Sequence, residues 1–196
     1  MTYLKRDARE EQLIALTVQL LTEKGYRATT TRDIAALGGV AVGNITRLFG
    51  SLTALKHAAL YRINDRLVAD TEAASVGKVP LDGLMTLLGD PTDARNQHVM
   101  SLWREVAVLA NSDPTLLVIH QHALRGWAQS VAGYLEAQAP HVRLRDSASR
   151  TAWRLIGFAT GMDLLHEIGA MPGSLDEMKQ DLARFIAAEI YNDEVR

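Results

Sequence analysis

The chain has 196 residues, 47% of them hydrophobic and 22% charged, a formal net charge of −2 and no cysteine. This composition is typical of a folded globular protein, and the lack of cysteine excludes disulfides, thiol nucleophiles and Cys-ligated metal sites. No apolar run approaches the roughly 18–20 residues of a membrane span, and the first nine residues lack the apolar segment of a signal peptide. We therefore expect a cytoplasmic protein without a membrane partner.

The first predicted helix covers residues 10–24, where apolar residues recur at three- and four-residue spacing. Gly25 follows it and is typical of a helix stop. Residues 3–11 are highly charged and are expected to form a loose arm before this helix. The helix is expected to close a three-helix core with the two helices that follow.

Those two short helices are predicted in the stretch from Thr30 to Leu55. Thr30 precedes Asp33 by three residues, which predicts a start resembling a capping box, with Asp in place of the usual Glu or Gln. Gly39 can adopt a positive φ at the turn between the helices. Ala35 and Gly39, four residues apart, indicate where the second helix crosses close to the first. Together these features predict a helix-turn-helix, and the alternative is an ordinary helical hairpin within a bundle.

The rest of the chain is predicted to be helical throughout. Ser51 can cap a long helix ending near Ala74, and all five prolines come after residue 79, where helical patterns begin or end. Further helices are predicted at 81–89, 94–111, 114–138, 146–168 and 174–191. No stretch alternates with period two, so we predict an all-α fold of about nine helices.

The charge is unevenly distributed along the chain. Residues 1–66 carry ten Lys and Arg against six Asp and Glu, a balance of +4, and the remainder has a balance of −6. Because neutralisation of phosphates supplies most non-specific DNA affinity, a basic N-terminal part favours binding of DNA by that part.

The N-terminal sequence resembles the tetracycline-repressor (TetR) family of bacterial transcription regulators over roughly residues 9–60. The resemblance depends on turn and core positions at fixed offsets: Leu20 to Tyr26 (LLTEKGY), Thr29 to Thr31, Ile34-Ala35, Gly39-Val40, Gly43-Asn44-Ile45, Phe49 and Leu55. The segments 103–114 and 153–162 look like the C-terminal domains of the subgroup related to the betaine-responsive regulator. The resemblance implies a helix-turn-helix head followed by a helical body that binds a ligand and dimerises.

Four positions depart from the family pattern. Where the family usually has a polar residue, a tyrosine, a histidine and a lysine, this chain has Ala41, Thr46, Leu48 and Leu52 respectively. In the family most of those residues contact DNA phosphates, which fix the register of the protein on the duplex. Lys56, one turn beyond Leu52, and Arg47, beside Thr46, are the candidates for partial replacement.

The candidate DNA-binding residues lie around the second and third predicted helices. Arg47 could pair with guanine or a phosphate, Asn44 could read adenine, and Gly43 would allow close backbone approach. Each of these could also be an ordinary solvated residue. The full predicted set is Thr30, Thr31, Arg32, Val42, Gly43, Asn44, Thr46, Arg47 and Lys56.

Large apolar residues of the body recur on helical faces and favour either a plain core or an apolar effector pocket. Two tryptophans and a methionine lie near possible polar groups, and the family resemblance favours the pocket. The predicted ligand-binding residues are Met100, Trp103, His120, Trp127, Phe158, Met162 and His166.

The last two predicted helices are candidates for self-association. Gly157 and Gly161 lie four apart beside Trp153 and Leu164, which would allow close helix contact, and the final helix has a long apolar stripe. The alternative is burial within one chain. The predicted interface comprises Trp153, Gly157, Gly161, Leu164, Leu182, Phe185 and Ile186.

Catalytic and metal-binding motifs are lacking. His120 and His122 are two residues apart and so project in different directions on a helix, whereas helical metal pairs need a spacing of three or four. The sequence has no His-Glu-x-x-His, no Gly-x-Ser-x-Gly and no phosphate-binding loop. We therefore expect no enzymatic activity, no metal and no cofactor.

The sequence thus favours a ligand-responsive regulator of the TetR type, with a DNA-binding domain at 1–50 and a ligand-binding and dimerisation domain at 51–196. The expected partners are a palindromic operator in double-stranded DNA, a small-molecule effector and a second copy of the chain. Family resemblance favours a repressor that the effector releases. The alternative is a protein of the same fold that binds a ligand or a protein and has lost strong DNA binding.

Overall fold

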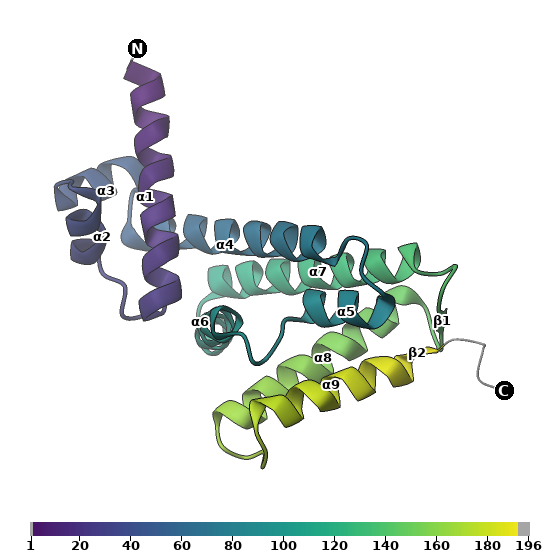
Figure 1. Cartoon of the computed structure of the whole chain (residues 1–196). Helices are drawn as coiled ribbons and strands as arrows, with labels where there is room; N and C mark the ends of the chain where they lie inside the picture. Colours follow the sequence, from purple (N-terminus) through teal and green to yellow (C-terminus); the bar gives the residue numbers. More distant parts are fainter. Residues whose placement is uncertain (1, 192–196) are drawn as a thin grey trace. The chain divides into compact units, whose positions relative to one another are not determined.

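The computed structural model describes residues 2–191, with side chains for residues 6–190. Nine α-helices and two short strands make up this part of the chain (Figure 1). The helices are α1 Thr2–Lys24, α2 Thr31–Gly38, α3 Val42–Phe49, α4 Leu52–Ser75, α5 Pro80–Leu88, α6 Ala94–Ala110, α7 Pro114–Ala137, α8 Ala148–Glu167 and α9 Leu175–Glu189. The predicted all-α fold is confirmed.

The chain divides into two compact units. Within the described residues, the first comprises residues 2–66 with 98–123, and the second comprises residues 67–97 with 124–191. Each has an apolar core of its own: Leu13, Leu20, Ile34, Ala35, Ile45 and Leu55 form one in the first unit. The division into functional domains at residues 50 and 51 stays a prediction.

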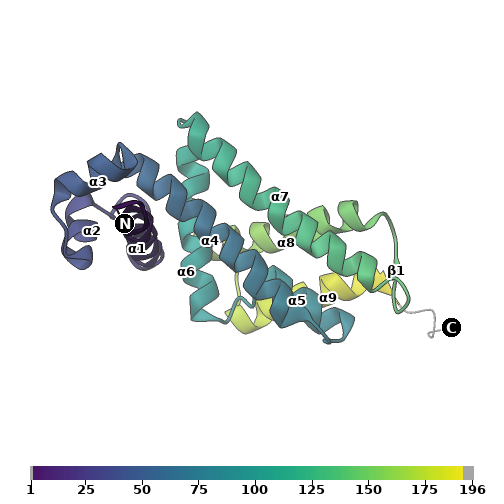
Figure 2. The same cartoon turned by 90° about the horizontal axis from the view of Figure 1, so that it is seen from above.

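The predicted helix-turn-helix is present in the first unit, where α2 and α3 lie beside α1 (Figure 2). At the start of α2, the Asp33 N–H donates to Thr30 Oγ1 at 3.2 Å, and the Thr30 N–H donates to Asp33 Oδ2 at 3.0 Å. This reciprocal pair is the predicted capping box. Gly39 ends the helix with φ 60°, a conformation that costs glycine little.

Of the two small residues predicted to mark the crossing of α2 and α3, Gly39 has no close neighbour, and a different glycine, Gly38, lies where α2 contacts α1. A Cβ on Gly38 would lie 3.2 Å from side-chain carbons of Leu13 and Leu16, whereas one on Gly39 would meet nothing within 4 Å. Close approach to α1 therefore depends on Gly38, and Gly39 serves the turn.

The charged N-terminal residues also differ from the expected loose arm, because α1 begins at Thr2. Arg6 pairs with Glu10 at 2.8 Å, and Arg9 donates to Gln12 at 2.8 Å. Pairs at these spacings stabilise a helix, and they account for its extension over the charged residues.

Local signals fix several other helix ends as predicted. The Ala54 N–H donates to Ser51 Oγ at the start of α4, and Pro80 occupies the first turn of α5. A second capping box, between Ser174 and Glu177, begins α9 and was not predicted.

The core of the second unit is apolar and joins α5, α7, α8 and α9. Leu84, Leu87, Val131, Leu135, Ala152, Leu155, Leu182 and Ile186 are among its buried members. Helices α8 and α9 run side by side (Figure 1). None of the helices within the described residues has the length and apolar content needed to cross a membrane.

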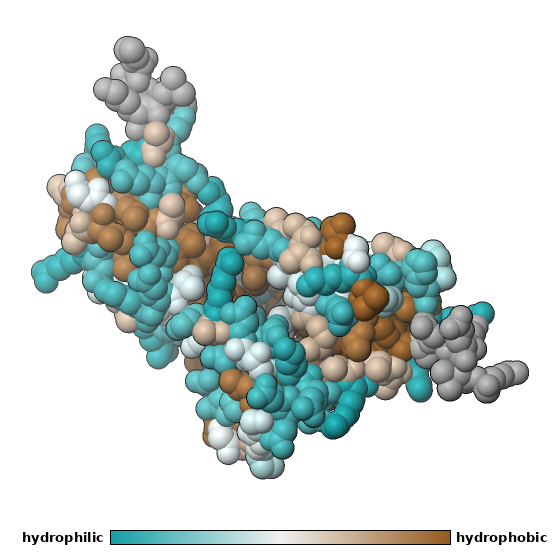
Figure 3. Space-filling model, viewed as in Figure 1, coloured by the Kyte–Doolittle hydropathy of each residue, from teal (hydrophilic) through white to brown (hydrophobic). Residues whose placement is uncertain are grey.

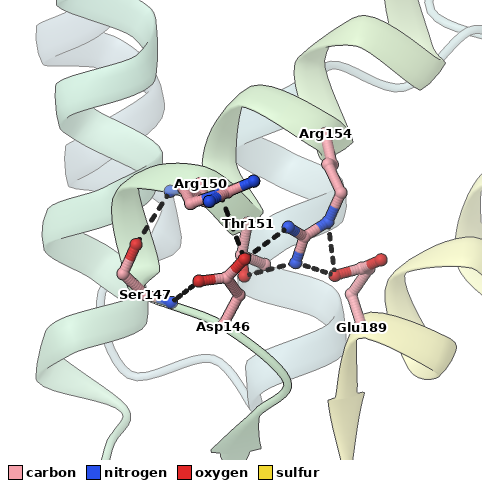
Figure 4. A network of polar contacts seen from close by, with 6 residues as sticks. All are labelled: Asp146, Ser147, Arg150, Thr151, Arg154 and Glu189. Atoms are coloured by element: carbon pink, nitrogen blue, oxygen red, sulfur yellow. Dashed lines mark hydrogen bonds and ion pairs between the residues drawn. The ribbon is translucent and has the colours of Figure 1, made fainter.

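Ion pairs join elements at the edges of this core. Arg154 of α8 donates to Glu189 of α9 at 2.6 and 3.0 Å and to Asp146 at 3.3 Å (Figure 4). Next to this network, Arg143 and Leu144 (β1) pair antiparallel with Tyr191 and Ile190 (β2). This two-residue strand pairing has no counterpart among the predicted elements, because it is too short to show any alternation.

Candidate nucleic-acid interface

The eight residues of α3 divide into a buried face and an exposed face. Ile45 is fully buried in the head core, and Leu48 and Phe49 pack partly against it. Val42, Gly43, Thr46 and Arg47 are exposed. Because these four positions lie one turn apart in pairs, they form one continuous surface of the helix.

The polar groups of this surface are few. Arg47 Nη2 donates to Asn44 Oδ1 at 3.4 Å, and Asn44 is itself half-buried. Arg47 therefore extends from the exposed face with one side of its guanidinium held by Asn44. The remaining N–H groups of the guanidinium are donors of the kind that pair with guanine or with a phosphate.

The three predicted residues at the start of α2 have different surroundings. Thr30 is exposed but its hydroxyl and amide are used in the capping box, Thr31 is half-buried, and Arg32 is exposed. The capping box also holds the pKa of Asp33 at about 2, because the Thr30 hydroxyl, then Lys24 and then the Thr30 amide hydrogen-bond its carboxylate. The charged carboxylate thus stabilises the first turn of α2.

Two of the departures from the family pattern have a structural explanation. Leu48 and Leu52 both pack partly against the head core, where a histidine or lysine would have to reach outward instead. Ala41 precedes α3 as its N-cap residue and supplies no side-chain hydrogen bond. The side chains at these three positions therefore offer no hydrogen-bond donor to a phosphate.

The structure contradicts the predicted exposure of Lys56. Its side chain is only 6% exposed, and its Nζ donates to the Tyr26 carbonyl at 2.5 Å and lies 4.6 Å from the centroid of the Tyr26 ring. Burial lowers the pKa of this ammonium, and the nearby Glu105 carboxylate opposes that shift. Because Lys56 is used inside the fold, we do not propose it as a phosphate contact.

Glu105 of α6 completes this arrangement and was not predicted. Its two carboxylate oxygens accept the backbone N–H groups of Tyr26 and Arg27 at 2.6 and 2.8 Å. The turn between α1 and α2 is thus held by Glu105 through its amides and by Lys56 through a carbonyl. We call Tyr26, Arg27, Lys56 and Glu105 the turn clamp. No local sequence signal marks Glu105, because its partners are 78 and 79 residues away.

Two half-buried histidines also belong to the first unit. His57 Nε2 and His120 Nδ1 are buried, and neither has a hydrogen-bond partner among the residues that the structure describes. Burial lowers the pKa of both rings, and for His57 the charge of Asp113 opposes the shift. His120 lies against the buried Trp103, with ring centroids 5.9 Å apart. Of this pair of histidines, only His120 was predicted as a ligand contact.

The remaining predicted ligand contacts are divided between the units. Met100 is half-buried in the first unit. In the second, Trp127 Nε1 donates to the Leu87 carbonyl at 2.7 Å, and the Phe158 ring stacks on Phe185 at 4.1 Å. Met162 is buried and His166 is half-buried. Their role as ligand contacts stays a prediction.

The predicted dimer interface separates into exposed and buried residues. Trp153, Gly157 and Leu164 are exposed along α8, and Gly161 is half-buried with open space at its Cα. Leu182 and Ile186 are buried in the core of the second unit, which corrects their assignment to an interface between copies. Phe185 is half-buried against Phe158. The apolar stripe of α9 therefore packs within one chain.

Comparison with known proteins agrees with this geometry. Residues 13–59 match the family model described as bacterial regulatory proteins, tetR family. No curated protein matches the sequence.

Three solved structures illustrate the likeness of fold. A putative transcriptional regulator from Saccharomonospora viridis in complex with choline is 23% identical, over 95% of this chain and 99% of that one, with a TM-score of 0.76. A TetR-family transcriptional regulator from Cytophaga hutchinsonii is 19% identical, over 94% and 96%, with a TM-score of 0.75. The multidrug binding protein EbrR complexed with proflavin is 22% identical, over 90% and 99%, with a TM-score of 0.62.

The described residues form an all-α fold in which a helix-turn-helix presents an exposed face of α3. Residues 13–59 are thus similar to the family model of the bacterial tetR regulators, and the fold of the described residues is that of solved TetR-family regulators. The likeness to the betaine-responsive subgroup stays a prediction.

Proposed function

We propose that this protein is a homodimeric repressor that binds a palindromic operator through α3 and is released by a small-molecule effector. The observation that carries the proposal is the exposed face of α3, where Arg47 and Thr46 extend from a helix whose other face is fixed in the head core. Arg32 on α2 adds a second exposed cation nearby in the sequence. These groups supply phosphate or base contacts of the kind that the second helix of a helix-turn-helix makes.

The proposed dimer interface is the exposed stripe of α8. Trp153 and Leu164 are large apolar residues open to solvent, and Gly157 and Gly161 between them let a second helix approach closely. An exposed apolar stripe of this kind is typical of an association surface. A two-fold pair of heads would then read half-sites one DNA turn, or a multiple of it, apart.

The proposed effector contacts start with Trp103 and His120. A tryptophan face beside a buried ring nitrogen without a partner offers an apolar contact and one free hydrogen-bonding group. The choline and proflavin complexes of two structural neighbours support a small organic molecule as the effector. Both of those ligands are cationic, and an aromatic face is suited to a cation.

The turn clamp couples effector binding near α6 to the helix-turn-helix. Trp103 and Glu105 lie two residues apart on α6, and Glu105 holds the α1–α2 turn by two backbone amides. A shift of α6 on ligand binding would therefore move or release that turn. The effector can act only through higher affinity for the state that binds DNA weakly, so DNA must weaken effector binding by the same factor.

Fluorescence anisotropy with duplex DNA from upstream of the protein's own coding region tests the proposal. We expect a saturable complex at low and moderate salt, and scrambled DNA should compete with it poorly. Arg47→Ala should lose most of the affinity for this DNA. Choline and proflavin, added separately with tryptophan fluorescence as the binding signal, are the first effector probes. A probe that binds but leaves operator affinity unchanged is not the effector. If no compound from a wider screen weakened the complex, the proposed release by an effector would be wrong.

A second candidate function is favoured by the apolar substitutions in the head. Leu48 and Leu52 pack on the core and Lys56 is buried, so three positions expected to anchor phosphates do not face outward. The protein would then bind a ligand or a protein through the same fold without strong specific DNA binding. Absence of any sequence-specific complex at low salt, in a protein that still binds a ligand, would favour this alternative.

A further inference from the structure

The exposed surface of the helix-turn-helix carries apolar side chains as well as basic ones. Figure 3 shows hydrophobic side chains gathered over α2 and α3. Leu37 of α2 and Val42 of α3 are each 47% exposed, a large value for apolar residues in an otherwise packed head. Val42 lies in the first turn of α3, the part of a recognition helix that contacts base edges.

The local sequence of α3 is poorly suited to a solvent-exposed helix. Ala41 provides no side-chain cap, and the exposed positions include Gly43 and the β-branched residues Val42 and Thr46. Each of these has a lower helix propensity than alanine, and alanine is among the poorest N-cap residues. Residues that go against helix propensity and N-cap preference are expected at functional sites. These residues are therefore more consistent with a binding role than with stabilising the helix.

Val42 and Thr46 present methyl groups on the same face, one helical turn apart. Gly43 beside them has open space, with nothing within 4 Å of the position of a Cβ. The surface therefore offers an apolar contact with room for a partner to approach, next to the Arg47 guanidinium. In the major groove the C5-methyl of thymine is the one apolar group among the base edges.

We propose that Val42, assisted by the Thr46 methyl, reads a thymine in each operator half-site by contact with its C5-methyl group. This inference rests on the proposed function, because it names the base that the same surface of α3 recognises. DNA is favoured as the occupant because both helices of the motif also carry an exposed cation, Arg32 on α2 and Arg47 on α3, and phosphates line the major groove. The half-site then combines a thymine at Val42 with a hydrogen-bonded base at Arg47.

The test begins with selection of binding sites by the full-length protein from a randomised duplex library. Each thymine of the selected half-site is then replaced by uracil, which deletes the C5-methyl and leaves base pairing unchanged. At one thymine we expect uracil to weaken wild-type binding about three- to fourfold, the amount expected for loss of one buried methyl contact. Val42→Ala should bind the thymine and uracil duplexes equally at that position.

Leu37→Ala is the matched control, because Leu37 has the same exposure but lies on α2. It should keep the wild-type preference for thymine over uracil. Val42→Thr, which retains one methyl and the β-branched shape, should keep part of that preference, and circular dichroism checks that each variant is folded.

The outcomes separate this inference from the proposed function. Failure to select any sequence would overturn both. Selection of a sequence whose binding is unaffected by uracil, or a thymine preference that persists in Val42→Ala, would overturn the inference alone and leave the proposed function standing. Equal loss of the preference in Leu37→Ala and Val42→Ala would also overturn it, because the apolar surface would then act as a whole.

Discussion

The two compact units use polar side chains in different ways. In the first unit, the Lys56 ammonium is buried, the Glu105 carboxylate caps backbone amides, and the ring nitrogens of two histidines are enclosed. In the second unit the core is apolar, and its ion pairs, such as Lys179 with Asp90 and Arg154 with Glu189, lie at the edges. Both units have an apolar core, but only the first encloses a buried ammonium, Lys56, among the described residues.

This difference predicts different responses to substitution and to pH. A buried polar group that loses its partner keeps its desolvation cost, so the first unit should respond strongly to single polar deletions. An apolar core responds to lost volume, and ion pairs at its edge contribute little because solvent screens them. The predictions below run from the largest expected effect to the smallest.

Ile186→Ala should give the largest change, a loss of about 2–5 kcal/mol of unfolding free energy, because it opens a cavity in a packed core. Ile186 is 0% exposed in the second unit. Urea unfolding at two protein concentrations measures the effect. Leu164→Ala, on the exposed face of α8, is the control and should change the dimer dissociation constant with little effect on the core. A small loss in Ile186→Ala that grew on dilution would instead place Ile186 in an interface.

Glu105→Ala should lower the unfolding free energy by about 1–3 kcal/mol, because the N–H groups of Tyr26 and Arg27 lose their charged acceptor. Hydrogen exchange of those two amides gives a local readout and should become faster. Glu136→Ala, an exposed acid on α7, is the matched control and should change neither. Unchanged protection of the Tyr26 and Arg27 amides in Glu105→Ala would contradict the turn clamp.

Most of the fold could be predicted because its signals are local. The Thr30–Asp33 capping box, the turn at Gly39, the Ser51 cap and the prolines each act within four residues of the helix end they define. The sequence positions of these residues are therefore sufficient to place the helix-turn-helix and most helices of the body. The start of α1 was missed because the i,i+3 and i,i+4 pairs of a charged segment also occur in loose arms.

The assignment of side chains to a site or a core could not be predicted as well. The apolar stripe on α9 indicates that Leu182 and Ile186 pack against another apolar surface. The stripe does not indicate whether that surface belongs to the same chain or to a second copy. Lys56 has the spacing of an outward-facing lysine, yet the Tyr26 ring and carbonyl lie within its reach. Glu105 contacts its partners only because tertiary packing brings them together, so no short-range sequence pattern predicts these contacts.

The buried histidines predict a dependence of stability on pH. Burial lowers the pKa of His120 below its ordinary 6.5, so as pH falls below 6.5 the unfolded chain takes up a proton that the folded chain does not. The unfolding free energy should therefore decrease as pH falls from 6.5 toward the folded pKa. Urea midpoints between pH 7.5 and 5 measure it.

In His120→Phe part of this pH dependence should disappear, and His57, whose pKa is lowered in the same direction, accounts for part of the remainder. An identical pH profile in His120→Phe and wild type would contradict the enclosed neutral ring. His141→Phe, at an exposed histidine of the second unit, is the control for the general effect of replacing a histidine by phenylalanine.

The smallest expected effect concerns Asp33. Its pKa is about 2 against an ordinary 3.8, so the capping contribution is present above 3.8 and is lost as pH falls through about 2. Thr30→Ala removes the largest cause and should move the Asp33 pKa upward toward 3.8, which carboxyl-carbon NMR can follow. A pKa that stayed near 2 would show that Lys24 and the backbone N–H of residue 30 are sufficient without the hydroxyl.

The most direct test compares two cations of the first unit, Arg47 on the exposed face of α3 and Lys56 in the turn clamp. The slope of log affinity against log salt, measured on the selected operator, counts the phosphates that cations neutralise. If Arg47 contacts a phosphate in addition to or in place of a base, Arg47→Ala lowers the slope by about one; in either case it weakens specific binding. Lys56→Met, whatever it does to stability, should leave the slope unchanged. A slope reduced in Lys56→Met, with affinity and slope both unchanged in Arg47→Ala, would contradict the proposed DNA-binding surface.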